Sequence, residues 1–339
     1  MQFAPAWRLS LSSYWRSFRA VNSVRSSTSS SKSATLRYAA LLAGTCAILL
    51  IGLEIFSIYA VKHYSVTYAR VSRQYAEAVR VYPAAPTEPT SVLMVGNSLL
   101  LDGVDVDQLR KLTTSTLRIY PIFLEGTGYY DWLYGLRRLF RQGSRPQVVV
   151  IGFEVNTALA NGVWDESPMM LFDARDVLGV ASDLALDHTA TSNLLLSHMS
   201  AFWEMRGFFR RRILLRLVPH FEDLFPFVRS DLTIPQGGEF EAILMSRLRT
   251  LRELCEAYGA KLILVIPPTP SSENAVRRMA IASQKVGVNA LVPIDPMALS
   301  PRFYQRDAVH LNVDGAVRFT FALAVDLSKT IKDVANNLS

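Results

Sequence analysis

Apolar blocks of different lengths alternate with mixed polar stretches along most of the chain. The longest block, 38–61, has about the 20 apolar residues that an α-helix needs to cross a bilayer. After residue 90 the apolar blocks are short and rich in β-branched residues, which is typical of buried strands. The pattern predicts four strands and a short fifth one, at 92–95, 117–124, 147–151, 261–266 and 291–294.

Between these strands the apolar residues recur every three or four positions, which predicts helices. The clearest helix is 240–258, which Gly259 would end. Other helices are predicted at 62–82, at 130–141 and from about residue 313 onward. Strands that alternate with helices indicate an α/β fold, with a parallel sheet covered on both faces. We therefore expect a three-layer α/β/α domain with a flavodoxin-like sheet and its site at the carboxyl ends of the strands.

The pattern divides the chain into four parts. We expect a basic, Ser-rich cytoplasmic tail, a transmembrane helix, a stalk with a Pro-rich linker, and an α/β domain, at 1–37, 38–61, 62–90 and 91–339 respectively. Residues 160–235 interrupt the alternation, and we predict a helical insertion or cap there.

The formal net charge of the 339 residues is +7, and most of it lies in the tail. Residues 1–37 hold no Asp or Glu, so the remaining residues together carry a net charge of only +1. The six basic residues of the tail are Arg8, Arg16, Arg19, Arg25, Lys32 and Arg37. This distribution gives no indication of a nucleic-acid footprint, and we expect no nucleic-acid partner. The positive-inside rule instead predicts a single-pass inner-membrane protein with its N-terminus in the cytoplasm and its domain in the periplasm or outside the cell.

Two alternatives concern the apolar block. A cleaved signal peptide would have a shorter core, of about 7–15 residues, and small residues at its cleavage site. Residues 61–63, Val-Lys-His, do not supply such a site, which favours an uncleaved anchor. Glu54 lies inside the block. It is either a carboxyl group near the outer interface, protonated or snorkelling, or a contact with another membrane protein.

Metal and disulfide chemistry are not indicated. Cys46 lies in the apolar block and Cys255 lies in the domain, so the two cannot pair across a bilayer. The sequence contains no Cys/His cluster with metal-ligand spacing, and we expect neither a metal nor a cofactor.

Candidate chemistry begins where the first predicted strand ends, at Gly96-Asn97-Ser98. A helix is predicted to follow at once, so Ser98 would lie near N–H groups that favour developing negative charge. A serine nucleophile needs a base. Of the five histidines, only His310 has an Asp three residues earlier in a polar segment, and Asp307 there could hold the imidazole in the tautomer that faces Ser98.

These motifs resemble the SGNH, or GDSL-like, hydrolase family. Its first block is matched by "VGNSLL" and its fourth by "DAVHLNVDGA", while "FLEGTGYYDWL" and "VVVIGFEVNTAL" stand at the second and third. The match covers about residues 91–335. The resemblance implies that Ser98 is the nucleophile, with His310 and Asp307 completing a triad. It also implies an oxyanion hole formed by the backbone N–H groups of Ser98 and Gly126 and the side-chain amide of Asn156.

The third block departs from the family pattern. Gly152 lies four residues before Asn156, and Thr157 stands where the family has Asp. In the second block Gly128 could replace Gly126. Glu154 is open to two interpretations, a side chain in the site or a structural residue.

Two other groups of residues have structural and functional interpretations. The arginines between 206 and 216 either form a solvated helix face or hold an anionic glycan or lipid head group: Arg206, Arg210, Arg211, Arg212 and Arg216. The tryptophans Trp132, Trp164 and Trp203 either pack in the core or cap or stack on sugar rings.

The leading hypothesis is a membrane-anchored serine esterase or O-acyltransferase acting on acyl, above all acetyl, esters of cell-surface polysaccharide. By its resemblance in architecture, a membrane-bound O-acyltransferase is a possible partner. The alternatives are a lipid or lysophospholipid esterase and a non-catalytic scaffold of a cell-envelope polysaccharide complex.

Overall fold

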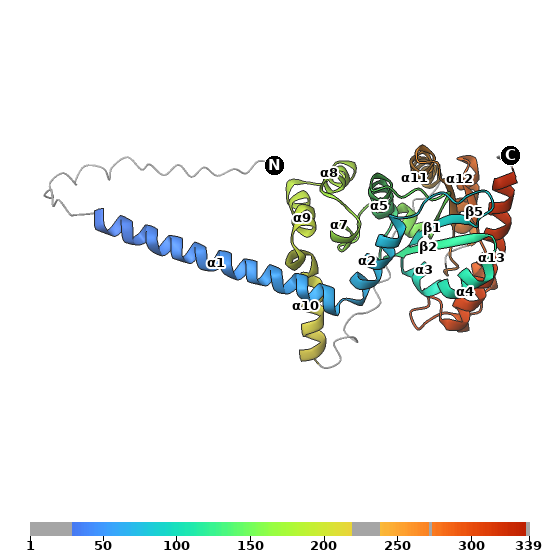
Figure 1. Ribbon diagram of the computed structural model, residues 1–339. Helices are drawn as coiled ribbons and strands as arrows, with labels where there is room; N and C mark the ends of the chain where they lie inside the picture. The colour runs from blue at the N-terminus through green and yellow to red at the C-terminus, as the bar shows by residue number, and fades with distance from the viewer. Residues whose placement is uncertain (1–28, 219–237, 271–272, 337–339) are drawn as a thin grey trace, which may run out of the picture. The chain divides into compact units, whose positions relative to one another are not determined.

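The computed structural model describes residues 29–218, 238–270 and 273–336, and Figure 1 gives the labels used below. The chain forms two units, Met1–Gly52 and Leu53–Ser339. The first strands and helices are α1 (Ser29–Tyr64), α2 (Val66–Ala78), β1 (Thr90–Gly96), α3 (Ser98–Gly103), α4 (Val106–Thr113), β2 (Leu117–Phe123), α5 (Tyr129–Arg141) and β3 (Val148–Gly152). The others are α6 (Val155–Leu159), α7 (Ser167–Met170), α8 (Ala174–Asp183), α9 (His188–Met199), α10 (Ala201–Leu217), α11 (Gly238–Ala257), β4 (Lys261–Val265), α12 (Glu273–Lys285), β5 (Asn289–Leu291) and α13 (Val313–Asn336).

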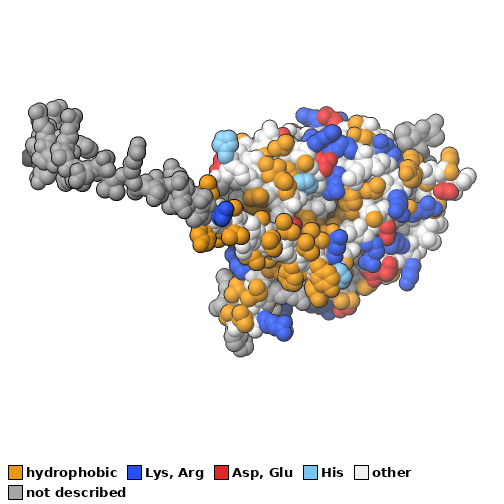
Figure 2. Space-filling model, turned by 60° about the vertical axis from the view of Figure 1, so that its left-hand side comes forward, with side chains coloured by type: hydrophobic (Ala, Val, Ile, Leu, Met, Phe, Trp, Pro, Cys, Tyr) orange, Lys and Arg blue, Asp and Glu red, His pale blue; other side chains and the backbone are white. Residues whose placement is uncertain are grey.

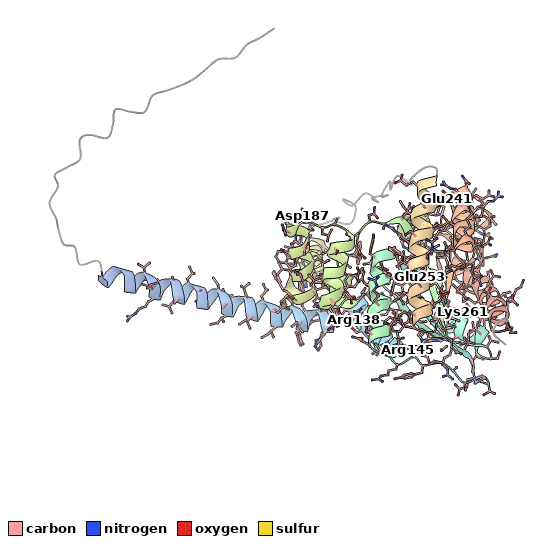
Figure 3. All side chains as sticks on the ribbon, turned by 90° about the horizontal axis from the view of Figure 1, so that it is seen from above. Arg138, Arg145, Asp187, Glu241, Glu253 and Lys261 are labelled. Carbon is pink, nitrogen blue, oxygen red and sulfur yellow. The ribbon has the colours of Figure 1, made fainter. Side chains whose placement is uncertain are left out.

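The five strands form one parallel sheet in the order β2-β1-β3-β4-β5, which confirms the flavodoxin-like α/β prediction. Successive side chains of each strand point to opposite faces. Leu93 and Val95 face a core shared with α5, α11 and α12, while Val92 and Met94 face a core shared with α3, α4 and α13. Figure 3 follows α11 from Glu241 past Glu253, with Lys261 at the start of β4.

The predicted strands lie within about two residues of those observed, except the fifth. It was predicted at 291–294 and lies at Asn289–Leu291, where it pairs with Ile263–Val265 of β4. This strand has only three residues at the sheet edge, so pairing with β4 sets its position more than its own composition does.

The predicted stalk also differs from the structure. Helix α2 packs on the α/β domain, because its Val71 and Ala78 are buried in the core shared with α5. Arg70 of α2 forms an ion pair with Glu125, at 2.7 Å between Nη2 and Oε1, and also hydrogen-bonds to the Phe123 carbonyl oxygen. The segment after the apolar block is therefore part of the folded domain.

Among the described residues, one helix is long and apolar enough to span a membrane, Thr35–Tyr64. Its large hydrophobic side chains are mostly exposed, including Leu41, Leu42, Ile48, Leu49, Leu50 and Ile51. In the view of the molecule in Figure 2, hydrophobic side chains gather toward the lower left of the described surface, and charged side chains are more frequent on the right.

Glu54, near the end of this helix, has a partner within the chain. Its carboxylate accepts hydrogen bonds from the Ser200 hydroxyl at 2.7 Å and from the backbone N–H groups of Ala201 at 2.6 Å and Phe202 at 3.2 Å. A carboxylate at a helix N-terminus satisfies N–H groups that the helix leaves free. Glu54 thus caps α10, and nearby Ser57, Ala60 and Val61 are buried, so the last turns of α1 pack within the second unit.

The predicted insertion, 160–235, is described from residue 160 to 218. It does not stand apart from the domain, because Leu171 and Phe172 beside α7, and Val177 and Val180 of α8, are buried in the main core. Residues 219–237 lie outside the described part of the chain.

Candidate active site

The turn from β1 to α3 places Ser98 at the first position of a helix. Asn97 caps that helix: its Oδ1 accepts a hydrogen bond from the Leu99 N–H at 3.0 Å. The Asn97 amide nitrogen donates to the carbonyl oxygen of Thr127 at 3.2 Å. Asn97 is buried, and its hydrogen bond to Thr127 joins the Ser98 turn to the loop after β2.

Two glycines let α3 approach the sheet closely. Gly96 and Gly152 are paired neighbours at the ends of β1 and β3, and Leu100 of α3 lies against both. A Cβ atom on Gly96 would lie 2.7 Å from Leu100 Cδ1, and one on Gly152 would lie 2.3 Å from it. The absence of these side chains sets how near Ser98 stands to the carboxyl end of the sheet.

His310 reaches the same edge from the turn that precedes α13. Its Nε2 lies 2.8 Å from Ser98 Oγ, and its Nδ1 lies 2.5 Å from Asp307 Oδ2. Because a carboxylate accepts hydrogen bonds, Nδ1 carries the proton and Nε2 is left as the acceptor of the Ser98 hydroxyl. The structure therefore brings together the three side chains that the sequence singled out.

A compact turn holds Asp307 in place. Its Oδ1 accepts hydrogen bonds from the backbone N–H groups of Val309 at 2.9 Å and His310 at 3.0 Å, across Ala308 at φ 58°. Burial raises the pKa of Asp307, but these hydrogen bonds and the His310 ring outweigh burial, and the pKa lies below its ordinary value. The side chains of His310 and Asp307 are 25% and 22% exposed, which leaves the pair open to a substrate.

The loop after β2 distinguishes between the two glycines that could form an oxyanion hole. The Gly128 N–H donates to Asp131 Oδ2 at 2.7 Å, so it is occupied. Within the described part of the chain, the N–H groups of Ser98 and Gly126 have no hydrogen-bond acceptor. The loop therefore favours Gly126 over Gly128 as a donor to an oxyanion.

Asp131 supports this loop and was not found from the sequence. It is 1% exposed, and its Oδ1 accepts a hydrogen bond from the Trp164 N–H at 2.9 Å while its Oδ2 binds Gly128. Burial raises the pKa of Asp131 to about 6 against these hydrogen bonds. Its position three residues after Gly128, in the first turn of α5, was the available signal, since an acidic residue there can close a capping box.

The third block is arranged differently from the family pattern. Glu154 caps α6, with its Oε1 accepting a hydrogen bond from the Thr157 N–H at 2.9 Å, which favours the structural interpretation of Glu154. Burial raises the pKa of Glu154, although the backbone and side chain of Asn156 oppose the rise by hydrogen bonding to it. No hydrogen bond joins Asn156 to Ser98 or His310 in the described residues, so its oxyanion role stays a prediction.

The tryptophans have separate places. Trp132 is buried, and its indole N–H donates to Thr127 Oγ1 at 3.0 Å. Trp203 lies under the Arg206 guanidinium, 4.6 Å from the ring centroid. The Trp164 ring lies over Gly126, where φ is +73° and an added Cβ would be 2.4 Å from the indole.

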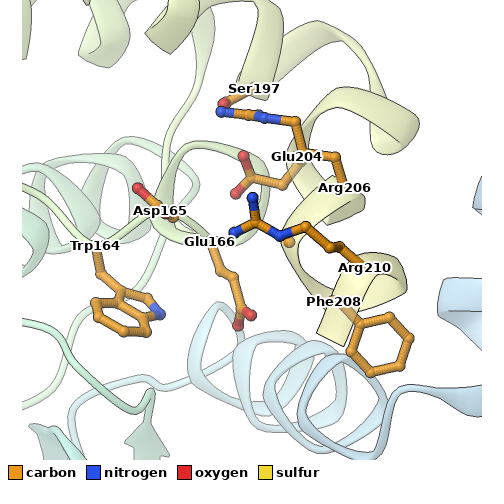
Figure 4. Close-up of a pocket in the computed structure, with 9 residues that line it drawn as sticks. Trp164, Asp165, Glu166, Ser197, Glu204, Arg206, Phe208 and Arg210 are labelled. Carbon is orange, nitrogen blue, oxygen red and sulfur yellow. The ribbon is translucent and has the colours of Figure 1, made fainter. Parts of the chain in front are cut away.

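Trp164 also lines a pocket of about 520 Å³ between the loop after α6 and helices α9 and α10. Figure 4 shows Glu204 and Arg210 projecting from α10 toward the loop that carries Trp164, Asp165 and Glu166. The other lining residues are Ser197, Arg206, Gly207 and Phe208. Arg206 and Arg210 thus line the same pocket as the acidic residues Asp165, Glu166 and Glu204. The side chains of Arg211 and Arg212 lie outside the described part of the chain.

Glu204 is the most perturbed carboxyl group of this pocket. Burial raises its pKa to about 8, with Glu166 and Asp165 adding to the rise and Ser197 and Arg206 opposing it. Neither carboxyl oxygen makes a hydrogen bond of standard geometry among the described residues, although the Ser197 hydroxyl is near enough to lower the pKa. At neutral pH Glu204 is mostly protonated.

This pKa predicts a pH-dependent stability. The folded chain holds a proton on Glu204 up to about pH 8, whereas the unfolded chain releases it near pH 4.5, so stability falls as pH rises through this window. Between pH 4.5 and pH 8 the loss is about 5 kcal/mol, at about 1.4 kcal/mol per pH unit. Thermal unfolding of the full chain in detergent should show Glu204→Gln with a flatter pH dependence than wild type, while Glu253→Gln, at an exposed position, should match wild type. Parallel profiles for Glu204→Gln and wild type would contradict this assignment.

Among the described residues, no group of three or more His, Cys, Asp or Glu could hold a metal ion. Both cysteines are free, with Cys255 buried.

Comparison with known proteins gives only distant similarities. No protein-family model and no curated protein matches the chain. TesA is similar at 14% identity over 69% of this chain and 96% of that chain, with a TM-score of 0.37. An Axe2 acetylxylan esterase variant from Geobacillus stearothermophilus is similar at 12% identity over 70% and 93%, with a TM-score of 0.35. The acetylxylan esterase Est2A from the rumen bacterium Butyrivibrio proteoclasticus is similar at 9% identity over 73% and 65%, also with a TM-score of 0.35. At these TM-scores the likenesses carry no argument about activity, which depends on the site geometry.

Proposed function

We propose that this chain is a serine hydrolase of ester bonds, and specifically a membrane-anchored, extracytoplasmic esterase or O-acyltransferase. Its substrates would be acyl esters, above all acetyl esters, of cell-surface polysaccharide. The observation that carries the proposal is the chain of contacts from Ser98 Oγ to His310 Nε2 at 2.8 Å and from His310 Nδ1 to Asp307 Oδ2 at 2.5 Å.

These contacts support acyl transfer in two steps. Ser98 Oγ attacks the ester carbonyl carbon while His310 Nε2 takes the hydroxyl proton, and Asp307 stabilises the imidazolium. The tetrahedral oxyanion would accept hydrogen bonds from the N–H groups of Ser98 and Gly126, with the Asn156 amide as a third proposed donor. On collapse, the alkoxide leaves with the proton from His310 and the acyl group stays on Ser98.

The second step restores the serine. Water or a sugar hydroxyl gives its proton to His310 and attacks the acyl-enzyme. The bond from the acyl carbon to Ser98 Oγ then breaks, His310 returns the proton to Oγ, and a carboxylic acid or a new ester is released. An esterase and an O-acyltransferase share this triad and differ in the acceptor that reaches it. We propose that a membrane-bound O-acyltransferase supplies the acyl group when the acceptor is a sugar.

The location is proposed from the apolar helix and the basic tail. Thr35–Tyr64 is suited to span the bilayer, and the six basic residues of 1–37 favour a cytoplasmic N-terminus. The Ser98 site would then lie in the periplasm or outside the cell.

A covalent probe tests the proposal. The full chain in detergent should be labelled by a fluorophosphonate, which reacts only with an activated serine, and Ser98→Ala should abolish the label. Ser182→Ala, at an exposed serine of α8, should label like wild type. Absence of labelling of folded wild type would reject the hydrolase proposal and favour a scaffold.

A further inference from the structure

The pocket between α10 and the loop after α6 has a feature that folding alone does not explain. Glu204 is 6% exposed and lines the pocket, yet neither of its oxygens has a hydrogen-bond partner of standard geometry in the described residues. A buried polar group without a partner costs about 1–3 kcal/mol. A ligand that supplies the missing hydrogen bonds would remove this cost.

One wall of the pocket lies against a loop of the proposed active site. Trp164 forms one of its walls and lies over Gly126, the glycine with the free N–H group. The next residue, Thr127, is bound to Asn97 beside Ser98. Asp131 binds the backbone of both Trp164 and Gly128, so the pocket wall and the loop at the active site are held by one buried carboxyl group.

The opposite wall is also fixed. Helix α10 carries Glu204, Arg206 and Arg210, and its N-terminus is capped by the Ser200 hydroxyl and by Glu54. A pocket whose two walls are both held in place suits a specific ligand, because few side chains have to be ordered on binding.

The side chains select a class of ligand. Arg206 and Arg210 donate hydrogen bonds, Asp165 and Glu166 accept them, and a protonated Glu204 does both. The two guanidinium groups share the pocket with the carboxyl groups of Asp165 and Glu166, so the lining is not of one sign and favours neither an anion nor a cation. Charged groups also disfavour a long acyl chain, because burying them against it would leave them without partners. Hydroxyl groups, which donate and accept, match this lining, and the exposed Trp164 ring can cover the apolar face of a sugar.

We propose that this pocket is a subsite for an uncharged sugar residue of the glycan, held between Trp164 and Glu204 beside the Ser98 site. The inference rests on the proposed function, since it names the part of the substrate that is bound next to the reacting ester. Trp164 and Glu204 would thus be specificity residues, and they would not touch the reacting atoms.

Binding can be measured without catalysis, in full-length Ser98→Ala protein in detergent. Isothermal titration would use four probes: cellotetraose, maltotetraose, chitotetraose and the anionic trigalacturonate. At least one neutral tetrasaccharide should bind, and trigalacturonate should bind at least about 10-fold more weakly. Adding Trp164→Ala or Glu204→Gln should weaken the neutral ligand about 10-fold, or about 1.4 kcal/mol. Tyr82→Ala and Glu253→Gln, at exposed positions outside the pocket, are the matched controls.

The outcomes separate this inference from the proposed function. The subsite is rejected if no neutral tetrasaccharide binds. It is also rejected if Trp164→Ala and Glu204→Gln both bind the sugar as tightly as the parent protein and have the same melting temperature as the parent. Fluorophosphonate labelling of wild type then decides independently whether the serine hydrolase proposal stands. Preferred binding of trigalacturonate would likewise overturn the neutral-sugar assignment.

Discussion

Replacing His310 with alanine is expected to lower the rate of acyl-enzyme formation by about 10⁶-fold, close to the effect of removing the serine itself. The reason is geometric: His310 Nε2 is the group placed to take the Ser98 proton, at 2.8 Å from its oxygen. Without it, the hydroxyl must lose its proton to water. Stopped-flow measurement of the p-nitrophenol burst from p-nitrophenyl acetate reports this step.

Asp307→Asn should also lower this rate, by about 10³- to 10⁴-fold, although the side chain keeps its shape. Asp307 accepts from His310 Nδ1–H and from two backbone N–H groups. An amide can instead donate to Nδ1, which moves the imidazole proton to Nε2 and removes the acceptor of the serine proton. The tautomer, rather than the fold, is expected to change.

A second histidine, His188, provides the control for both variants. His188 lies at the exposed first position of α9, and His188→Ala should leave the burst rate within about twofold of wild type, as expected for a surface change. A rate for His310→Ala above a tenth of wild type would show that Ser98 is not activated by this histidine.

The sequence was sufficient to predict the sheet and the proximity of Ser98, His310 and Asp307, because both depend on local patterns. The strands around Val92 and Val148 are apolar runs bounded by polar residues, and a parallel arrangement places their carboxyl ends at one edge. Ser98 at the end of the first strand, and His310 before the last helix, are then close by topology.

Features set by long-range contacts were not predicted. The role of Asp131 depends on Trp164, 33 residues later, and the cap on α10 comes from Glu54, which is 146 residues before Ser200. Helix α12 was not predicted, and β5 was misplaced. The choice between Gly126 and Gly128 required knowing which N–H group was already bound, and sequence spacing does not contain that information.

Gly152→Ala is expected to disturb both the folding and the activity of this site. The new Cβ would lie 2.3 Å from Cδ1 and 2.4 Å from Cγ of Leu100, so α3 must shift or Leu100 must leave its rotamer. Overpacking of this kind costs about 1–3 kcal/mol of folding free energy. Because α3 also carries Ser98, the shift should lower kcat/KM for p-nitrophenyl acetate by about 10- to 100-fold, as a displacement of the order of 1 Å can do.

A double mutant distinguishes this clash from other causes. Leu100→Ala alone should destabilise by about 2–5 kcal/mol, because Leu100 is fully buried between the sheet and α13. Combined with Gly152→Ala, it should cost less than the sum of the two single variants, with a coupling of about 1 kcal/mol or more measured by thermal and denaturant unfolding. Gly162→Ala, where an added Cβ meets nothing within 4 Å, is the control and should be close to neutral. Two results would contradict this interpretation: strictly additive losses of stability in the double mutant, or full activity in Gly152→Ala. Ser98 would then be positioned by Asn97 and the loop after β2, and not by the packing of Leu100 against Gly96 and Gly152.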